Sequence, residues 1–275
     1  MTSIRVSVGQ FEAQRDVDAN FSKVNDLVQT AAADSDLIVL PENSMYSDPQ
    51  KQDTEFRYSE SLDGEFTSGL KKLAASHKVN ILVGITETNP ADERRPFNTL
   101  VRLTPEGELD GIYRKIHLYD AFGYRESDKV TPAPIADPLI FTINGVTIGA
   151  LTCYDLRFPE VVRWVALNGV DLVALPAAWA AGPLKELHWE SLIRARAIEN
   201  TVYFAGAGQT GPSCTGLSQI VDPMGVPMAC AGIESNVVAT SAVSSSQVQA
   251  VRKNNPSLEN RRFDVVPEQS PIMAR

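Results

Sequence analysis

The chain is 275 residues long; hydrophobic residues make up 43% of it and charged residues 21%. This is the composition of an ordinary globular protein with ample core material, so disorder, collagen-like repeats and a coiled coil are excluded as the main architecture. A net charge of −9 argues against a broad surface for nucleic acid or an anionic membrane. We expect one large domain spanning residues 1–275.

The first third of the chain alternates predicted strands and helices. Apolar residues recur at every second position in the first strand and then at helical spacing, with Asp16 or Asp18 available as the helix N-cap. The later strands are short apolar runs, typical of sheets covered by helices. In order, the segments are a strand at residues 4–8, a helix at 21–31, a strand at 37–40, a helix at 66–74 and a strand at 81–85.

The middle of the chain changes to hairpins. Strands are predicted at 99–103 and 111–115, around a turn at residues 105–107. A second pair of strands, at 140–143 and 146–151, flanks Asn144-Gly145, which is a strong hairpin signal.

Helices and strands then alternate again. The segments are a helix at about 159–167, a strand at 171–175, a helix at about 184–200, a strand at 202–205 and a hairpin turn at 222–225. Residues from about 253 to 275 are polar and rich in Pro and Arg, so we expect an arm that a partner subunit helps to order. So many strands favour an α/β fold with two packed sheets covered by helices.

Three segments place reactive side chains at the ends of apolar strands, where open α/β sheets bind ligands. Glu42 follows Pro41 at the end of the strand at 37–40, and Cys153 follows the strand at 146–151. Between them, Tyr113-Arg-Lys115-Ile-His117-Leu118 carries two cations and an imidazole.

Each of these residues alone has an ordinary structural interpretation. A lone cysteine in a strand is usually a small buried hydrophobic residue, and such a glutamate or lysine is usually solvated. Together, a thiol, a carboxylate and an ammonium are a complete set for amide hydrolysis, since the thiolate needs a base and the oxyanion needs a cation or N–H donors.

These segments resemble the nitrilase superfamily of carbon–nitrogen hydrolases. The similarity runs through Leu40-Pro-Glu42-Asn, Tyr113-Arg-Lys115-Ile-His-Leu, Thr152-Cys153-Tyr154-Asp-Leu-Arg157-Phe-Pro-Glu and His188-Trp-Glu-Ser-Leu-Ile-Arg-Ala-Arg-Ala-Ile-Glu-Asn200. The last two segments are most similar to the ω-amidase and deaminated-glutathione-amidase branch. The resemblance implies a four-layer αββα sandwich and a homodimer paired through helices.

The resemblance also implies roles for individual residues. Glu42 would be the general base, Cys153 the nucleophile that forms a thioester, and Lys115 with the backbone N–H of Tyr154 the oxyanion site. Glu126 is the candidate for the second glutamate that positions the lysine and the substrate.

The role of Arg157 stays open. It lies four residues after the nucleophile, close enough to meet a substrate carboxylate. The alternative, slightly favoured, is an ion pair with Glu160 or with carboxylates behind the site. His117 is interpreted as a supporting hydrogen-bonding residue and not as the base.

We expect no cofactor and no metal. Three cysteines and three histidines lack zinc-ligand spacing, and the Gly206–Gly211 match to a dinucleotide fingerprint is not expected to open a helix. Cys214 and Cys230 are interpreted as structural. An odd cysteine count, no secretory segment and no apolar run of ~18 residues favour a cytoplasmic protein without membrane contact.

The expected function is hydrolysis of a small linear amide, including amides that carry a carboxylate, with release of ammonia. The alternatives are N-carbamoyl hydrolysis, acyl transfer from the thioester, and a catalytically idle binding or scaffold protein. Nitrilases and carbamoylases more often have Trp at the position of Tyr154, which weighs against them. The intact Glu42, Lys115 and Cys153 weigh against an idle site.

Overall fold

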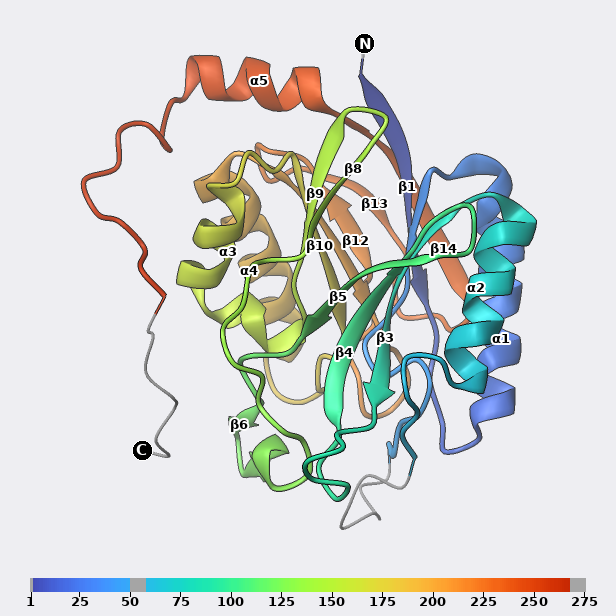
Figure 1. The fold of residues 1–275 in the computed structure, drawn as a ribbon. Helices are drawn as coiled ribbons and strands as arrows, with labels where there is room; N and C mark the ends of the chain where they lie inside the picture. Colours follow the sequence, from blue (N-terminus) through green and yellow to red (C-terminus); the bar gives the residue numbers. More distant parts are fainter. Residues whose placement is uncertain (1, 50–57, 268–275) are drawn as a thin grey trace.

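The computed structural model describes residues 2–49 and 58–267 and folds as a four-layer sandwich (Figure 1). Two six-stranded sheets pack face to face, with helices α1 and α2 outside one sheet and α3 and α4 outside the other. This confirms the predicted αββα architecture. None of the described helices is long and apolar enough to cross a membrane.

The first sheet has the order β14-β1-β2-β3-β4-β5. Its parallel centre comes from the β1–β2–β3 units, and its antiparallel strands come from the β3–β4–β5 hairpins and from β14. The bounds are β1 Ser3–Gln10, α1 Val17–Ala31, η1 Ala32–Asp34, β2 Leu37–Val39, α2 Glu65–His77, β3 Asn80–Glu87, β4 Phe97–Leu103, β5 Leu109–Arg114 and β14 Val237–Ser244.

The second sheet has the order β13-β12-β11-β10-β9-β8, with β9, β10 and β11 parallel. Its bounds are β8 Ile140–Ile143, β9 Val146–Ala150, η3 Cys153–Arg157, α3 Pro159–Ala166, β10 Leu172–Ala177, α4 Lys185–Asn200, β11 Tyr203–Gly208, β12 Gln219–Val221 and β13 Pro227–Cys230. A small hairpin of β6 Asp120–Ala121 and β7 Tyr124–Arg125 precedes η2 Glu126–Asp128, and α5 Ser245–Asn254 follows β14.

Alternation along the strands divides the first sheet's apolar side chains between two cores. Val6, Val8 and Val39 join the large core between the two sheets. Ile38 and Leu40 point to the other face and pack with residues of α1 and α2. Burying both faces explains the continuous apolar runs, because a strand inside a sandwich has no solvent side.

Local signals define several element ends. The Asp16 side chain accepts a hydrogen bond of 2.9 Å from Ala19 N, which confirms one of the two predicted N-caps of α1. Asn144 and Gly145 both have positive φ, as a two-residue hairpin turn requires, and they join β8 to β9. Pro159 occupies the start of α3, where its missing N–H has no consequence.

Two C-terminal elements were not predicted. β14 pairs with β1 over its whole length, from Ser3 opposite Ser244 to Gln10 opposite Val237. α5 lies at one end of the sandwich (Figure 1), where Arg252 donates to Val170 O at 2.7 Å. Beyond α5, residues 255–267 contain no helix or strand, and residues 268–275 of the predicted arm lie outside the described residues.

Candidate active site

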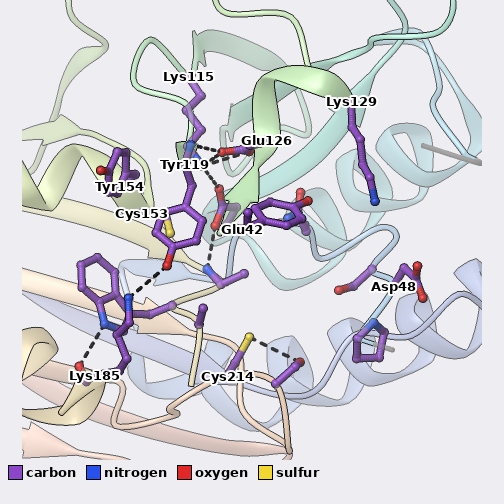
Figure 2. A pocket seen from close by; sticks show the side chains of 18 of the residues that line it. Glu42, Asp48, Lys115, Tyr119, Glu126, Lys129, Cys153, Tyr154, Lys185 and Cys214 are labelled. Carbon is purple, nitrogen blue, oxygen red and sulfur yellow. Dashed lines mark hydrogen bonds and ion pairs between the residues drawn. The ribbon is translucent and has the colours of Figure 1, made fainter. Parts of the chain in front are cut away.

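The three predicted reactive side chains meet at one end of the two sheets (Figure 2). Glu42 lies beyond the carboxyl end of β2, Lys115 follows β5, and Cys153 follows β9 at the first position of η3. All three are nearly inaccessible, with exposed fractions of 2%, 2% and 6%. The first sheet therefore supplies the carboxylate and the ammonium, and the second supplies the thiol.

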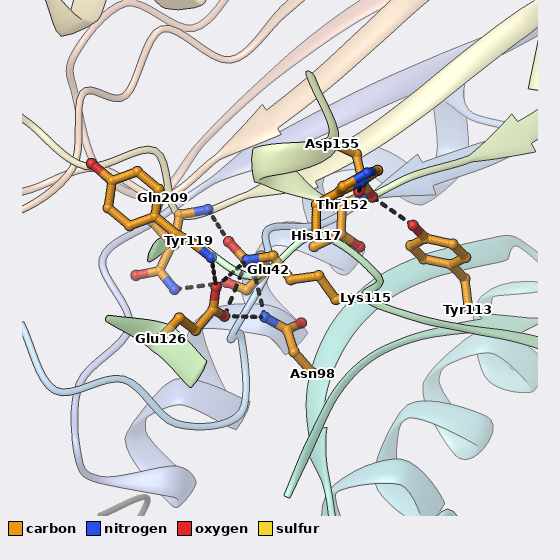
Figure 3. A network of polar contacts seen from close by, with 11 residues as sticks. Glu42, Asn98, Tyr113, Lys115, His117, Tyr119, Glu126, Thr152, Asp155 and Gln209 are labelled. Carbon is orange, nitrogen blue, oxygen red and sulfur yellow. Dashed lines mark hydrogen bonds and ion pairs between the residues drawn. The ribbon is translucent and has the colours of Figure 1, made fainter. Parts of the chain in front are cut away.

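Cys153 lies on a sharp turn from strand to 3-10 helix. Its φ of 44° is unusual for a residue with a side chain. The turn is held by Thr152 N, which donates to Asp155 Oδ2 at 2.9 Å. The Asp155 carboxylate also accepts a hydrogen bond of 2.7 Å from Tyr113 Oη, and its Oδ1 lies 2.7 Å from His117 Nδ1 (Figure 3). His117 thus orients the turn behind the thiol, as predicted, and Phe158 stacks on its ring.

Lys115 bridges the two glutamates. Its Nζ donates to Glu42 Oε1 at 2.8 Å and to both Glu126 oxygens at 3.1 and 2.8 Å (Figure 3). Glu126 is further held by Tyr119 N at 2.6 Å. The structure therefore brings Glu126 to the lysine, where the sequence had placed it.

Three further donors reach Glu42 and were missed from the sequence. Asn98 Nδ2, on β4, donates to Glu42 Oε1 at 2.7 Å, and Ala178 N, after β10, donates to Glu42 Oε2 at 2.7 Å. Gln209 Nε2 donates to the Glu42 carbonyl at 2.7 Å and so holds its backbone. The Glu42 carboxylate is fixed from both sheets, which leaves it little freedom to rotate.

These contacts set the protonation states. Burial disfavours the Glu42 carboxylate, but the Lys115 charge and the hydrogen bonds from Lys115, Cys153 and Ala178 N outweigh it and hold its pKa below the ordinary range. Burial raises the pKa of the Cys153 thiol well above its usual value, and the Glu42 charge adds to this effect. Burial opposes the Lys115 charge, yet Glu126 and Glu42 raise its pKa well above the ordinary value. The resting site therefore pairs a neutral thiol with a carboxylate and an ammonium.

A cavity of about 160 Å³ opens over Cys153. Tyr154 and Arg157 both line this cavity. Among the described residues Arg157 has no ion pair with Glu160 or another carboxylate; it lies over the Trp179 ring, 4.8 Å from its centre. The favoured interpretation of Arg157 as half of an ion pair was therefore wrong, because the chain turns its side chain toward the cavity.

The cavity also includes a lysine that sequence reasoning missed. Lys185, the first residue of α4, is only 6% exposed and lines the same cavity. Nothing in the sequence singled out Lys185, because a lysine at the start of a predicted helix is usually solvated.

The described residues contain no cluster of three or more histidine, cysteine or acidic side chains that could hold a metal ion. The Gly206–Gly211 segment ends β11 and continues as a loop in which Gly208 N donates to Ser218 Oγ at 2.8 Å. No helix opens there, so the segment lacks the helix N-terminus on which a dinucleotide fingerprint depends.

An αββα sandwich with glutamate, lysine and cysteine side chains meeting at its strand ends defines a hydrolase of the nitrilase type. Residues 5–253 match the carbon-nitrogen hydrolase family, and the chain belongs to that family.

Curated relatives and solved structures agree with this assignment. The chain is 38% identical over 260 residues to a deaminated glutathione amidase of Escherichia coli O157:H7, covering 94% of this chain and 97% of that protein. It is 31% identical over 277 residues to a hydrolase of Mycobacterium tuberculosis, covering 94% and 95%. The crystal structure of the Caenorhabditis elegans NitFhit protein superimposes with a TM-score of 0.85 at 26% identity, covering 95% of this chain and 66% of that one.

Proposed function

We propose that the protein is an amidase that hydrolyses the C–N bond of a small linear amide through a thioester on Cys153, releasing ammonia. The observation that carries the proposal is the convergence of Glu42, Lys115 and Cys153 beneath one cavity. Membership in the carbon-nitrogen hydrolase family and the relative named deaminated glutathione amidase support amide hydrolysis.

The first half of the reaction makes the thioester. Glu42 removes the thiol proton as Cys153 Sγ attacks the amide carbon, and the carbonyl electrons move onto oxygen. Lys115 Nζ and the Tyr154 N–H stabilise that oxyanion. In a site that excludes water, each such donor lowers the activation barrier by about 3–4 kcal/mol. Collapse of the tetrahedral intermediate breaks the C–N bond, and Glu42 passes its proton to the leaving nitrogen, so ammonia departs.

The second half restores the enzyme. Glu42, again a carboxylate, removes a proton from water as the water oxygen attacks the thioester carbon. The C–S bond then breaks, the proton returns to sulfur, and a carboxylic acid leaves. Glu126 does not touch the thiol; it holds Lys115 in place between the two carboxylates.

The protonation states suit this sequence. A thiol with a raised pKa is not ionised in advance, so the proton must move as the C–S bond forms. A glutamate with a lowered pKa is already the carboxylate that this step needs. The fixed ammonium of Lys115 offsets the negative charge throughout.

The remaining parts of the proposal concern compartment and assembly. Three cysteines without a disulfide are consistent with a reducing cytoplasm. An exposed apolar patch on α4 and the β12–β13 turn supports a homodimer. The substrate is a small molecule, since the reactive thiol is only 6% exposed and lines a cavity of about 160 Å³.

The test is ammonia release over a panel of amides, nitriles and N-carbamoyl compounds. We expect turnover of linear amides, and a loss of about 10³-fold or more in Cys153→Ala, which removes the nucleophile. Release of carbon dioxide together with ammonia would favour N-carbamoyl hydrolysis instead. A folded Cys153→Ala variant with near-normal rates would exclude the thioester route.

A further inference from the structure

Asp155 is a fully buried carboxylate that the proposed reaction does not use. Its exposed fraction is 0%, and it lies on η3, two residues after Cys153. Its Oδ2 accepts hydrogen bonds from Tyr113 Oη at 2.7 Å and from Thr152 N at 2.9 Å, and its Oδ1 lies 2.7 Å from His117 Nδ1. Because a buried carboxylate is stable only when donors surround it, these three contacts hold Asp155 firmly in place.

Two of these partners flank Lys115 along the chain. Tyr113 is in β5, two residues before Lys115, and His117 follows two residues after it. This segment follows a strand of the first sheet, whereas Asp155 follows a strand of the second. Figure 3 shows the Asp155 carboxylate beside both side chains. Asp155 therefore fastens the lysine segment to the turn that carries Cys153.

The contacts on both sides of the lysine are built to persist. Tyr113 is 7% exposed, and burial together with the Asp155 charge raises the pKa of its hydroxyl well above the usual value, so it remains a donor. The His117 ring stacks on Phe158, with 3.9 Å between the ring centres. Phe158 N in turn donates to the Asp155 carbonyl at 3.0 Å. The phenol, the carboxylate and the imidazole thus form one packed unit.

The two proposed oxyanion donors depend on this link. Lys115 Nζ is held by Glu42 and Glu126, whereas the Tyr154 N–H belongs to η3. An oxyanion that binds both donors needs each of them at about 2.7–3.1 Å. A displacement of about 1 Å can lower a rate about 100-fold. Since the donors come from different sheets, their separation depends on how the lysine segment is joined to η3.

We propose that Asp155 is the positioning residue that sets the separation of Lys115 Nζ and the Tyr154 N–H. The inference rests on the proposed function and assigns to Asp155 the alignment of the oxyanion site. Asp155 is not among the residues that line the cavity. It acts through Tyr113 and His117 on one side and through its own turn on the other. Loss of this link weakens oxyanion stabilisation and leaves the reactivity of the thiol itself intact.

The test separates oxyanion stabilisation from thiol reactivity. Tyr113→Phe removes one donor to Asp155 and keeps the ring, so it should lower kcat for butanamide about 10-fold while KM stays within about twofold. Methyl methanethiosulfonate reacts with the Cys153 sulfur without forming an oxyanion, so its rate, followed by peptide mass spectrometry, should stay within about twofold of wild type. Tyr203→Phe, an equal change at a buried tyrosine that begins β11, should leave all three values unchanged.

Substitutions at Asp155 itself grade the same contact. The oxygen of Asp155→Asn can accept from Tyr113 Oη and Thr152 N while its amide nitrogen faces His117 Nδ1. This variant should therefore recover most of the kcat that Asp155→Ala loses, which we expect to be about 100-fold. Equal losses in the two variants would contradict a role for Asp155 as a geometric link.

An aldehyde makes the measurement independent of turnover. Butanal adds to Cys153 as a thiohemiacetal: the C–S bond forms, and the thiol proton moves to the former carbonyl oxygen, which occupies the oxyanion site. The butanal concentration that protects Cys153 from the thiosulfonate should rise about 10-fold in Tyr113→Phe.

Two results would overturn the positioning role. One is equal butanal protection in wild type and Tyr113→Phe, and the other is a thiosulfonate rate that falls as far as kcat does. Failure of the wild-type protein to hydrolyse linear amides would instead overturn the proposed function, and butanal protection would still decide the role of Asp155.

Discussion

At the scale of single residues, the site depends on how one carboxylate is kept ionised. Glu42 is 2% exposed, an environment that alone would favour the neutral acid. The Lys115 charge and the hydrogen bonds from Lys115 and Ala178 N reverse this preference, and Asn98 Nδ2 helps to fix the same carboxylate in place. Asn98 is a positioning residue in this scheme, because it touches Glu42 and not the thiol.

This arrangement predicts the pH profile of kcat/KM for a neutral amide. The reaction needs Glu42 ionised, and its pKa lies below the ordinary value of 4.5, so activity falls only as the pH drops through that lower value. The pKa values of Cys153 and Lys115 lie well above 9.0 and 10.5, so no alkaline decline is expected near neutrality. The profile should be flat from about pH 6 to 8.5.

Asn98→Asp tests the cause of that profile. A third carboxylate beside Glu42 and Glu126 should raise the pKa of Glu42 and move the acid limb up by about 1–2 pH units. Asn98→Ala, which removes the donor without adding charge, should move it less. A wild-type acid limb between pH 6 and 7, unmoved by either substitution, would contradict the glutamate base and indicate a histidine.

At the scale of elements, β3 positions the segment that carries Glu42. Gly84 N donates to Pro41 O at 3.1 Å, and Ser44 N donates to Gly84 O at 2.9 Å. A Cβ at Gly84 would lie 2.5 Å from Glu42 Cα and 3.0 Å from Asn43 N. Both are backbone atoms, so a side chain at this position must displace the catalytic segment itself.

Gly84→Ala should therefore lower kcat by about 10-fold or more and also cost about 1–3 kcal/mol of unfolding free energy. Gly9→Ala is the matched control on β1, since its Cβ would meet a flexible side-chain end, Leu40 Cδ2, at 2.7 Å. That variant should lose stability while its kcat stays close to normal. Equal kcat values in two folded variants would show that β3 does not set the position of Glu42.

The sequence predicted the elements whose signals are local and missed those that depend on pairing. Strand ends at Pro41 and before Cys153 were visible because apolar runs stop there. β14 carries no strong periodicity, and its place is set by β1, more than 200 residues earlier. Asn98 and Ala178 N lie 56 and 136 residues from Glu42, so only the register of the strands brings these donors to the carboxylate.

At the scale of the whole molecule, the site lies where the two sheets meet. One large core joins inner-face residues of both sheets, including Val39 and Ile148, and the residues that line the active cavity come from both. Slight movement of one sheet against the other would separate Glu42 from Cys153. The dense core is thus also what holds the catalytic distances.

One exposed apolar surface suits the pairing of two such sandwiches. An exposed apolar patch spans α4 and the β12–β13 turn. Its side chains are 48–59% exposed and belong to Ile198, Met224, Val226 and Met228. The turn packs against the helix, since Ile198 Cδ1 lies 2.6 Å from where a Cβ on Gly225 would be. We expect a homodimer of 30.0 kDa chains buried through this patch. Ile198→Glu should raise the dimer dissociation constant about 100-fold in sedimentation equilibrium, because it buries an unpaired charge at each contact. Ile135→Glu, an equal change at an exposed position outside the patch, should not. Wild-type protein that stays monomeric would overturn the homodimer, and a dimer insensitive to Ile198→Glu would place the contact elsewhere.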